Sequence, residues 1–214
     1  MTLIINEIFY SIQGESLYAG LPCIFVRLSG CNLRCSYCDT RYAYNEGYSM
    51  GIEDLIKKIS SYNCSLVEIT GGEPLLQKDT PSLITMLLDE GYDVLLETNG
   101  SFDISKVDKG CIKILDVKCP GSNESDKNDL GNLNRISFQD QIKFVIKHRD
   151  DYEFAKKIIS LIPHDFPGDH ILFSAMFNEL SYDILAKWIL SDRLNVRLQI
   201  QLHKLIWPNH QRGV

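Results

Sequence analysis

Strand-like and helix-like stretches alternate along most of this 214-residue chain. The strand-like stretches are continuous apolar runs, a pattern typical of strands that are buried on both faces. They are predicted at residues 23–29, 65–70, 92–100, 111–118, 141–147, 170–175 and 195–202. Helices are predicted at residues 52–62, 80–91, 150–162 and 181–192. The alternation predicts an α/β fold in which helices cover a parallel sheet.

The number of these units favours a partial (β/α) barrel of about six units. A full barrel of eight units usually takes about 250 residues, which is more than this chain has. Residues 119–134 are polar and predict a loop or a short insertion. No internal repeat or linker divides the sequence, so residues 1–214 are expected to form a single domain. In such folds the active site lies at the C-terminal ends of the strands.

Charge and hydropathy limit the kinds of partner. The chain carries 28 acidic and 22 basic side chains, and its net charge of −6 argues against a protein that binds nucleic acid by neutralising phosphates. No apolar stretch approaches the ~20 residues of a membrane span. Residues 1–16 lack the pattern of a signal peptide. We therefore expect a cytoplasmic protein without a nucleic-acid or membrane partner.

Seven cysteines are present, an odd number that makes a disulfide framework an unlikely explanation in a reducing compartment. Cys23, Cys64 and Cys111 lie in or beside apolar runs, where a free thiol usually behaves as a small apolar side chain. These three are expected in the core. Cys119 receives no assignment from its surroundings.

The other three cysteines, Cys31, Cys35 and Cys38, fall within eight positions directly after the predicted strand 23–29. Three thiolates on one loop can bind three corners of a [4Fe–4S] cube and leave the fourth iron open, whereas a ferredoxin-type cluster uses a fourth cysteine. A zinc site would need a fourth ligand such as Cys23, which lacks the usual paired spacing. The spacing favours an open cluster over zinc, and zinc over chance.

The pattern Cys-x3-Cys-x-aromatic-Cys, with Tyr37 as the aromatic residue, resembles the radical S-adenosylmethionine (SAM) superfamily. Gly71-Gly72-Glu73-Pro74, one βα unit later, resembles the Gly-Gly-Glu motif that holds the methionyl amino group in that superfamily. The resemblance implies a [4Fe–4S] cluster whose open iron binds SAM. It also implies cleavage of SAM to methionine and a 5′-deoxyadenosyl radical that abstracts hydrogen from the substrate.

Residues 11–40, the "ETNG" stretch at 97–100 and the ending 201–214 resemble the 7-carboxy-7-deazaguanine synthase family, which makes a precursor of queuosine. The resemblance implies a lyase that converts 6-carboxy-5,6,7,8-tetrahydropterin to 7-carboxy-7-deazaguanine. Hydrogen is removed from C6, the ring contracts and ammonia leaves. It further implies Mg2+, a homodimer and a flavodoxin-like electron donor. Ser16 and Tyr37 depart from the family pattern, which often has Gly and Trp there.

The same resemblance implies roles for the cofactor-binding residues. Three cysteines hold the cluster, and Thr40 contacts Mg2+, provided that substrate carboxylate and water complete the oxygen shell. The residues expected around SAM are Tyr37, Cys38, Asp39, Gly72, Asp116 and Lys118. On the residues alone, Asp39 could equally cap the turn.

Substrate contacts are implied for residues Ile12, Gln13, Gly14, Glu15, Arg27, Thr70 and Val214, the last through the terminal carboxylate. Arg27, isolated in an apolar strand, is either a member of an ion pair or a clamp for an anion, and a substrate carboxylate favours the clamp. Glu97 is expected to handle protons, although a buried carboxylate can also be structural.

Two other readings stay open at this point. A glycyl-radical-activating enzyme shares the cysteine spacing but acts on a protein chain. A non-catalytic metalloprotein, either a zinc-stabilised binding module or an electron carrier, would also use clustered cysteines.

Overall fold

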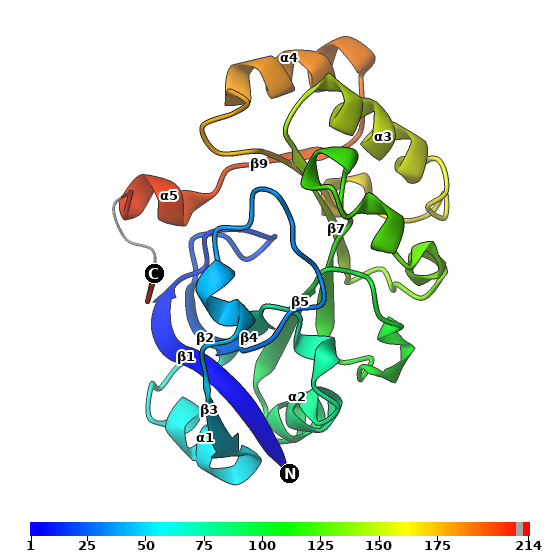
Figure 1. Ribbon diagram of the computed structural model, residues 1–214. Coiled ribbons are helices and arrows are strands. Elements are labelled where there is room, and N and C mark those ends of the chain that lie inside the picture. Colours follow the sequence, from blue (N-terminus) through cyan, green and yellow to red (C-terminus); the bar gives the residue numbers. More distant parts are fainter. Residues whose placement is uncertain (209–211) are drawn as a thin grey trace.

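The computed structural model describes residues 1–208 and 212–214. Its centre is one sheet with the strand order β3-β1-β2-β4-β5-β6-β7-β8-β9 among these residues (Figure 1). The strands are β1 (Thr2–Ile12), β2 (Pro22–Leu28), β3 (Tyr48–Gly51), β4 (Leu66–Gly71), β5 (Asp93–Thr98), β6 (Ile112–Asp116), β7 (Gln141–Ile146), β8 (Ile171–Ala175) and β9 (Arg197–Gln199). From β2 to β9 the neighbours are parallel, and β1 and β3 add an antiparallel edge.

The helices are α1 (Ile52–Ser60), α2 (Thr80–Asp89), α3 (Arg149–Ile159), α4 (Tyr182–Asp192) and α5 (Leu202–Ile206). The first four cover the crossovers at which sequence patterns predicted them. The β5–β6 and β6–β7 crossovers use short 3-10 turns instead. Seven parallel strands with six crossovers confirm the predicted partial barrel, while β1, β3 and α5 were not predicted.

Apolar side chains pack on the helix-facing side of the sheet. Val67 and Ile69 of β4, for example, lie in one core with Leu83, Ile84 and Leu87 of α2. Burial of each such side chain stabilises the fold by about 1.5–3 kcal/mol. Because side chains alternate along a strand, Glu68 and Thr70, which alternate with Val67 and Ile69 in β4, face the interior of the barrel.

The four cysteines outside the loop at 31–38 can be compared with their predicted positions in the core. Cys23, Cys111 and Cys119 are fully buried, and Cys64 is half-buried. All seven thiols are free. The prediction of a core position therefore holds for Cys23 and Cys111, and Cys119 joins them.

Residues 119–134 are not a bare loop, because they contain the 3-10 turns Pro120–Ser122, Ser125–Lys127 and Leu130–Asn134. Ser122 and Asn132 are fully buried within them. None of the helices within 1–208 and 212–214 has the length and apolar character needed to cross a membrane.

The segment after β1 closes the seam between the two edges of the sheet. Since β1 is antiparallel to β2, Ile12 lies beside Pro22 at the start of β2. Tilted strands in a barrel bring the start of one edge level with the end of the other. Accordingly, Ser16 N donates to Gln199 Oε1 of β9 (2.7 Å). The expectation of a site built only at C-terminal strand ends is therefore incomplete.

Candidate active site

A cavity of about 700 Å³ occupies the interior of the partial barrel. All residues predicted to hold the cluster, SAM, Mg2+ or substrate line this one cavity. They are Ile12, Gln13, Gly14, Glu15, Arg27, Cys31, Cys35, Tyr37, Cys38, Asp39, Thr40, Thr70, Gly72, Glu97, Asp116, Lys118 and Val214. Their positions span most of the chain, so the fold gathers them into a single compartment.

The cysteine loop, residues 31–40, leaves the end of β2 and borders one side of the cavity. Cys38 N donates to Cys35 O (3.2 Å), and Leu33 N approaches Cys31 Sγ (3.4 Å). Burial raises the pKa of Cys31, and it raises the pKa of Cys35 to about 11. These thiols would therefore lose their protons on binding iron, as cysteine ligands do. Three free thiols on one wall suit the chemistry of an iron–sulfur cluster.

The geometry does not favour a zinc site. Cys23 lies at the start of β2, five residues before its end, so about 16 Å of extended strand separates it from the cysteine loop. In the described part of the chain, no three His, Cys, Asp or Glu side chains are grouped to hold a metal ion. A cube does not need such convergence, because each thiolate binds a different iron.

Gly71 and Gly72 permit a close backbone contact between β4 and the cysteine loop. A Cβ on Gly72 would lie 2.0 Å from Gly30 O. Glu73 N donates to the same carbonyl oxygen at 2.8 Å. The Glu73 side chain is fully buried and accepts hydrogen bonds from Thr98 Oγ1 (2.7 Å) and Asn99 N (2.7 Å). The motif thus ties three segments together, and Gly72 also lines the cavity.

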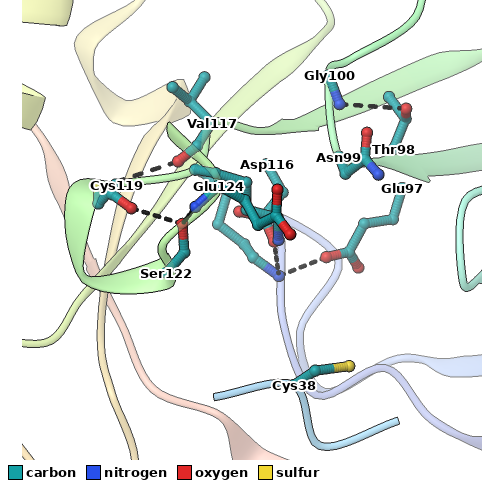
Figure 2. Close-up of polar contacts among 12 residues, drawn as sticks. Cys38, Glu97, Thr98, Asn99, Gly100, Asp116, Val117, Cys119, Ser122 and Glu124 are labelled. Atoms are coloured by element: carbon teal, nitrogen blue, oxygen red, sulfur yellow. Dashed lines mark hydrogen bonds and ion pairs between the residues drawn. The ribbon is translucent and has the colours of Figure 1, made fainter. Parts of the chain in front are cut away.

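Opposite the cysteine loop lies a group that we call the Lys143 cluster: Lys143, Glu15, Glu97 and Asp116. Lys143 Nζ lies 2.9 Å from Glu15 Oε2 and 3.7 Å from Asp116 Oδ2, and it also contacts Glu97 Oε1. Burial disfavours the ammonium, but the three carboxylates raise the pKa of Lys143 well above its usual value. Figure 2 shows Glu97 and Asp116 directed toward a common ammonium group, with Cys38 on the loop that faces them.

The Glu15 carboxylate already makes several contacts within the protein, in addition to its predicted contact with substrate. Besides Lys143, its carboxylate accepts hydrogen bonds from Gln199 Nε2 (3.0 Å) and Gln201 Nε2 (2.8 Å). Burial opposes ionisation, but Lys143, His203 and the hydrogen bond from Gln201 keep the pKa of Glu15 below its usual value. An ionised carboxylate offers about four acceptor positions, so roughly one remains for a ligand.

Backbone contacts shape the rest of residues 12–16, where substrate contacts were predicted. Gln13 N donates to Leu21 O (2.8 Å), so Ile12, one residue earlier, directs its own N–H and C=O away from β2. A Cβ on Gly14 would lie 2.3 Å from His203 Nδ1, and only glycine lets α5 pack here. Ser16 has a φ of 64°, which lies in the left-handed region that favours glycine.

Arg27 is an ion-pair member. Its Nε donates to Glu7 Oε1 at 2.7 Å, and the Tyr42 hydroxyl donates to the same oxygen at 3.0 Å. The pair uses only Nε, so the two Nη groups can still bind an anion in the cavity. Glu7 Oε2 also accepts from Gly213 N (3.2 Å), which holds Val214 beside Arg27.

Asp116 and Lys118 form an ion pair of 2.9 Å at the end of β6. Asp116 Oδ1 and the Tyr37 hydroxyl are buried and have no hydrogen-bond partner within the described residues. Buried polar atoms without a partner are uncommon in folded proteins. Since both residues line the cavity, these atoms fit a polar ligand such as SAM.

Sequence reasoning missed Lys143, Gln199, Gln201 and Glu68, all of which line or support the cavity. Glu68 is buried on β4, and Gln13 Nε2 donates to its carboxylate. Burial and the neighbouring Glu97 raise the pKa of Glu68 to about 8. Like Arg27, Glu68 and Lys143 are lone charged residues inside apolar strands, and that signal could have identified them.

Comparisons with known proteins agree with this arrangement. Residues 25–116 match the sequence model of the radical SAM superfamily. The 7-carboxy-7-deazaguanine synthase of Koribacter versatilis is 40% identical over 98% of this chain and 99% of its own. The enzyme of that name from Chlorobaculum tepidum is 43% identical over 98% and 96%. The crystal structure of QueE from Escherichia coli shares the fold, with a TM-score of 0.74, 22% identity and 94% of both chains covered. The chain therefore belongs to the 7-carboxy-7-deazaguanine synthase family of the radical SAM superfamily, whose members use an iron–sulfur cluster and SAM.

Proposed function

We propose that this chain converts 6-carboxy-5,6,7,8-tetrahydropterin to 7-carboxy-7-deazaguanine with loss of ammonia. The observation that carries the proposal is the single cavity that joins three free thiols to carboxylates, amides and basic side chains. Its volume of about 700 Å³ lies in the range of small-molecule sites. A pterin offers N–H donors and a carboxylate, which match the acceptors and the cations respectively.

In this proposal Cys31, Cys35 and Cys38 hold three irons of the cluster, and the fourth iron takes SAM. When bound, the two groups supply a 5′-deoxyadenosyl radical that removes hydrogen from C6. The remaining SAM contacts are proposed for Tyr37, Cys38, Asp39, Gly72, Asp116 and Lys118. The partnerless Asp116 Oδ1 and Tyr37 hydroxyl support this choice.

For Mg2+, the proposed protein ligand is the Thr40 hydroxyl, 3.7 Å from Cys38 Sγ. One hydroxyl cannot bind the ion alone, so the substrate carboxylate and water complete its shell. Asp39 is the neighbouring carboxylate, but it is paired with Lys204. Burial opposes its ionisation, yet Lys204 lowers the pKa of Asp39, so the pair serves better as a fixed contact of SAM than as a metal ligand.

The substrate contacts follow from the groups that stay available. The Nη groups of Arg27 take the pterin carboxylate, and the backbone of Ile12 and Gly14 meets the pyrimidine edge together with Gln13 and Glu15. Thr70 lies opposite Arg27 in the β2–β4 pairing. The carboxylate of Val214 completes the site from the tail.

Glu97 is the proposed proton carrier. Burial raises its pKa, while contact with Lys143 opposes the rise. A carboxyl group with a pKa closer to neutrality exchanges protons more effectively at physiological pH. Glu97 can take a proton at one oxygen while Lys143 holds the other, and ammonia needs a proton to leave.

The test is anaerobic turnover of the iron-loaded protein with reductant, SAM, Mg2+ and 6-carboxytetrahydropterin, with the product identified by mass. We expect several products per SAM. Glu97→Gln should lower product formation by about 10²–10⁴-fold and still release 5′-deoxyadenosine. Wild-type protein that cleaves SAM without forming product would overturn the pterin assignment. The relatives do not favour the alternative of a glycyl-radical-activating enzyme.

The proposal includes one domain over residues 1–214, a homodimer, a flavodoxin-like electron donor and a cytoplasmic location. Light scattering of the loaded protein measures the mass of the assembly. Comparing turnover with reduced flavodoxin and with dithionite tests the donor.

A further inference from the structure

Asn99 follows β5 directly, and its side-chain amide is held in one orientation. Its Oδ1 accepts from Ser101 N (3.0 Å) and from Ser101 Oγ (2.6 Å). Asn32 Nδ2 donates to Ser101 Oγ (2.8 Å), while Asn99 Nδ2 donates to Asn32 Oδ1 (3.1 Å). This closed ring of donors and acceptors fixes which atom of each side-chain amide is the nitrogen.

The second N–H of Asn99 Nδ2 points at Cys31 Sγ, 3.9 Å away. The backbone of Asn99 is fixed as well, because its N–H donates to the buried carboxylate of Glu73 (2.7 Å). Asn99 is buried, lines the cavity and is labelled in Figure 2 next to Glu97. Its amide is therefore a preorganised donor toward the sulfur.

The three cysteines of the loop do not receive equal numbers of N–H donors within the described residues. Cys31 Sγ has Leu33 N at 3.4 Å in addition to the Asn99 amide. Cys38 Sγ lies near the Thr40 hydroxyl at 3.7 Å and is also hydrogen-bonded to the Tyr44 side chain. Among the described residues, Cys31 is thus the loop cysteine whose sulfur has two N–H donors against it.

We propose that Asn99 donates an N–H···S hydrogen bond to the Cys31 thiolate of the loaded cluster and thereby raises the reduction potential of that cluster. Reduction adds one negative charge, and a donor at a coordinating sulfur stabilises the more negative state. Asn99 acts through Cys31 and is a positioning residue rather than a catalytic one. The inference rests on the cluster of the proposed function and is independent of the pterin.

The experiment is a potentiometric titration of the anaerobic, iron-loaded protein without pterin, followed by EPR of the reduced [4Fe–4S] cluster. Asn99→Ala should lower the reduction potential of the cluster by up to ~59 mV, which for a one-electron couple is a tenfold shift toward the oxidised state. Asn99→Asp has the same size but replaces the donor with an acceptor, so the reduction potential of its cluster should be lower still. The control is Asn134→Ala, an exposed asparagine outside the cavity, which should titrate like the wild type.

An Asn99→Ala variant with full iron content and an unchanged potential would overturn the proposal. If that variant loses iron, Asn99→Asp decides, and a potential equal to or above that of the wild type would count against the hydrogen bond. If the potentials of the Asn99 variants shift as expected but the wild type makes no deazaguanine, only the pterin assignment is overturned.

Discussion

The two walls of the cavity are built in opposite ways. The cysteine loop is ten consecutive residues, whereas the Lys143 cluster draws Glu15, Glu97, Asp116 and Lys143 from four separate segments. Glu15 and Lys143 alone are 128 positions apart. The loop depends on local spacing, and the cluster depends on the register of strands β5 to β7 and on the segment that closes the seam.

This difference predicts different responses to substitution. Replacing a cysteine of the loop should abolish turnover but change the free energy of unfolding little, because only one short loop is affected. Removing a member of the Lys143 cluster should cost stability as well, because charges from several strands lose their partner.

The largest expected effect is that of Cys35→Ser. It removes one of three cluster ligands, so product formation and the iron–sulfur absorbance should fall to background. Iron analysis and anaerobic turnover measure both. Cys64→Ser, a half-buried thiol outside the cavity, is the matched control and should retain iron. Four irons per chain in Cys35→Ser would show that the loop is not the cluster site.

Lys143→Met should lower the free energy of unfolding by about 3–5 kcal/mol, because it leaves buried carboxylates without their countercharge. Urea unfolding gives the value. Lys147→Met, at the next lysine of the same stretch, should change stability by less than about 1 kcal/mol. Equal destabilisation by both substitutions would mean that the cluster has no special electrostatic coupling.

Glu68→Gln should alter the pH dependence of stability. Since burial and Glu97 raise the pKa of Glu68 to about 8 from 4.5, the native state keeps a proton that the unfolded chain loses across that window. Stability of the wild type therefore declines as pH rises from about 4.5 to 8, and glutamine removes this decline.

Relative to its difference from the wild type at pH 4, Glu68→Gln should be more stable at pH 8 by on the order of 4 kcal/mol. Urea unfolding at several pH values measures the change. Glu53→Gln on the exposed surface of α1 is the control. Parallel pH profiles for wild type and Glu68→Gln would show that Glu68 is ionised in the native state.

The smallest effect is expected for Arg212→Ala. Arg212 pairs with Glu46 (2.7 Å) and lies 4.1 Å from the centroid of the Tyr42 ring, which fastens the tail to the segment after the cysteine loop. Exposed contacts of this kind contribute about 0.5–1 kcal/mol. The KM for the pterin should therefore rise roughly two- to fivefold at low salt, with kcat unchanged. Steady-state kinetics of Arg193→Ala provide the comparison, and an altered kcat would contradict a purely positional role.

Sequence patterns predicted the parts of the fold that follow from local periodicity. Strand β2, strands β4 to β9 and helices α1 to α4 appear where apolar runs and amphipathic stretches indicated them. Strand β1 was missed because Asn6 and Glu7 interrupt its apolar pattern, at the point where the pairing with β2 changes register. Helix α5 was missed because it has five residues, none of them buried, and depends on its contact with Gly14.

For the site, motifs sufficed where function lies in consecutive residues, as in the cysteine loop. They could not show that Glu15 is already held by Gln199 and Gln201, since that contact depends on closing the seam. Nor could they show that the backbone of Leu28 and of Gly30 requires glycine at positions 71 and 72. Such constraints arise from how distant segments meet, and no local pattern encodes them.

The long separation between Glu15 and its partners Gln199 and Gln201 has a consequence for biogenesis. A ribosome adding about 5–20 residues per second takes roughly 10–30 s to proceed from Cys38 to Gln199. Throughout that interval the three thiols have been synthesised, but the residues that hold Glu15 in place have not. A carrier delivering iron and sulfide to the nascent chain thus meets the thiols before the Glu15 side of the cavity exists, whereas after synthesis that side is in place.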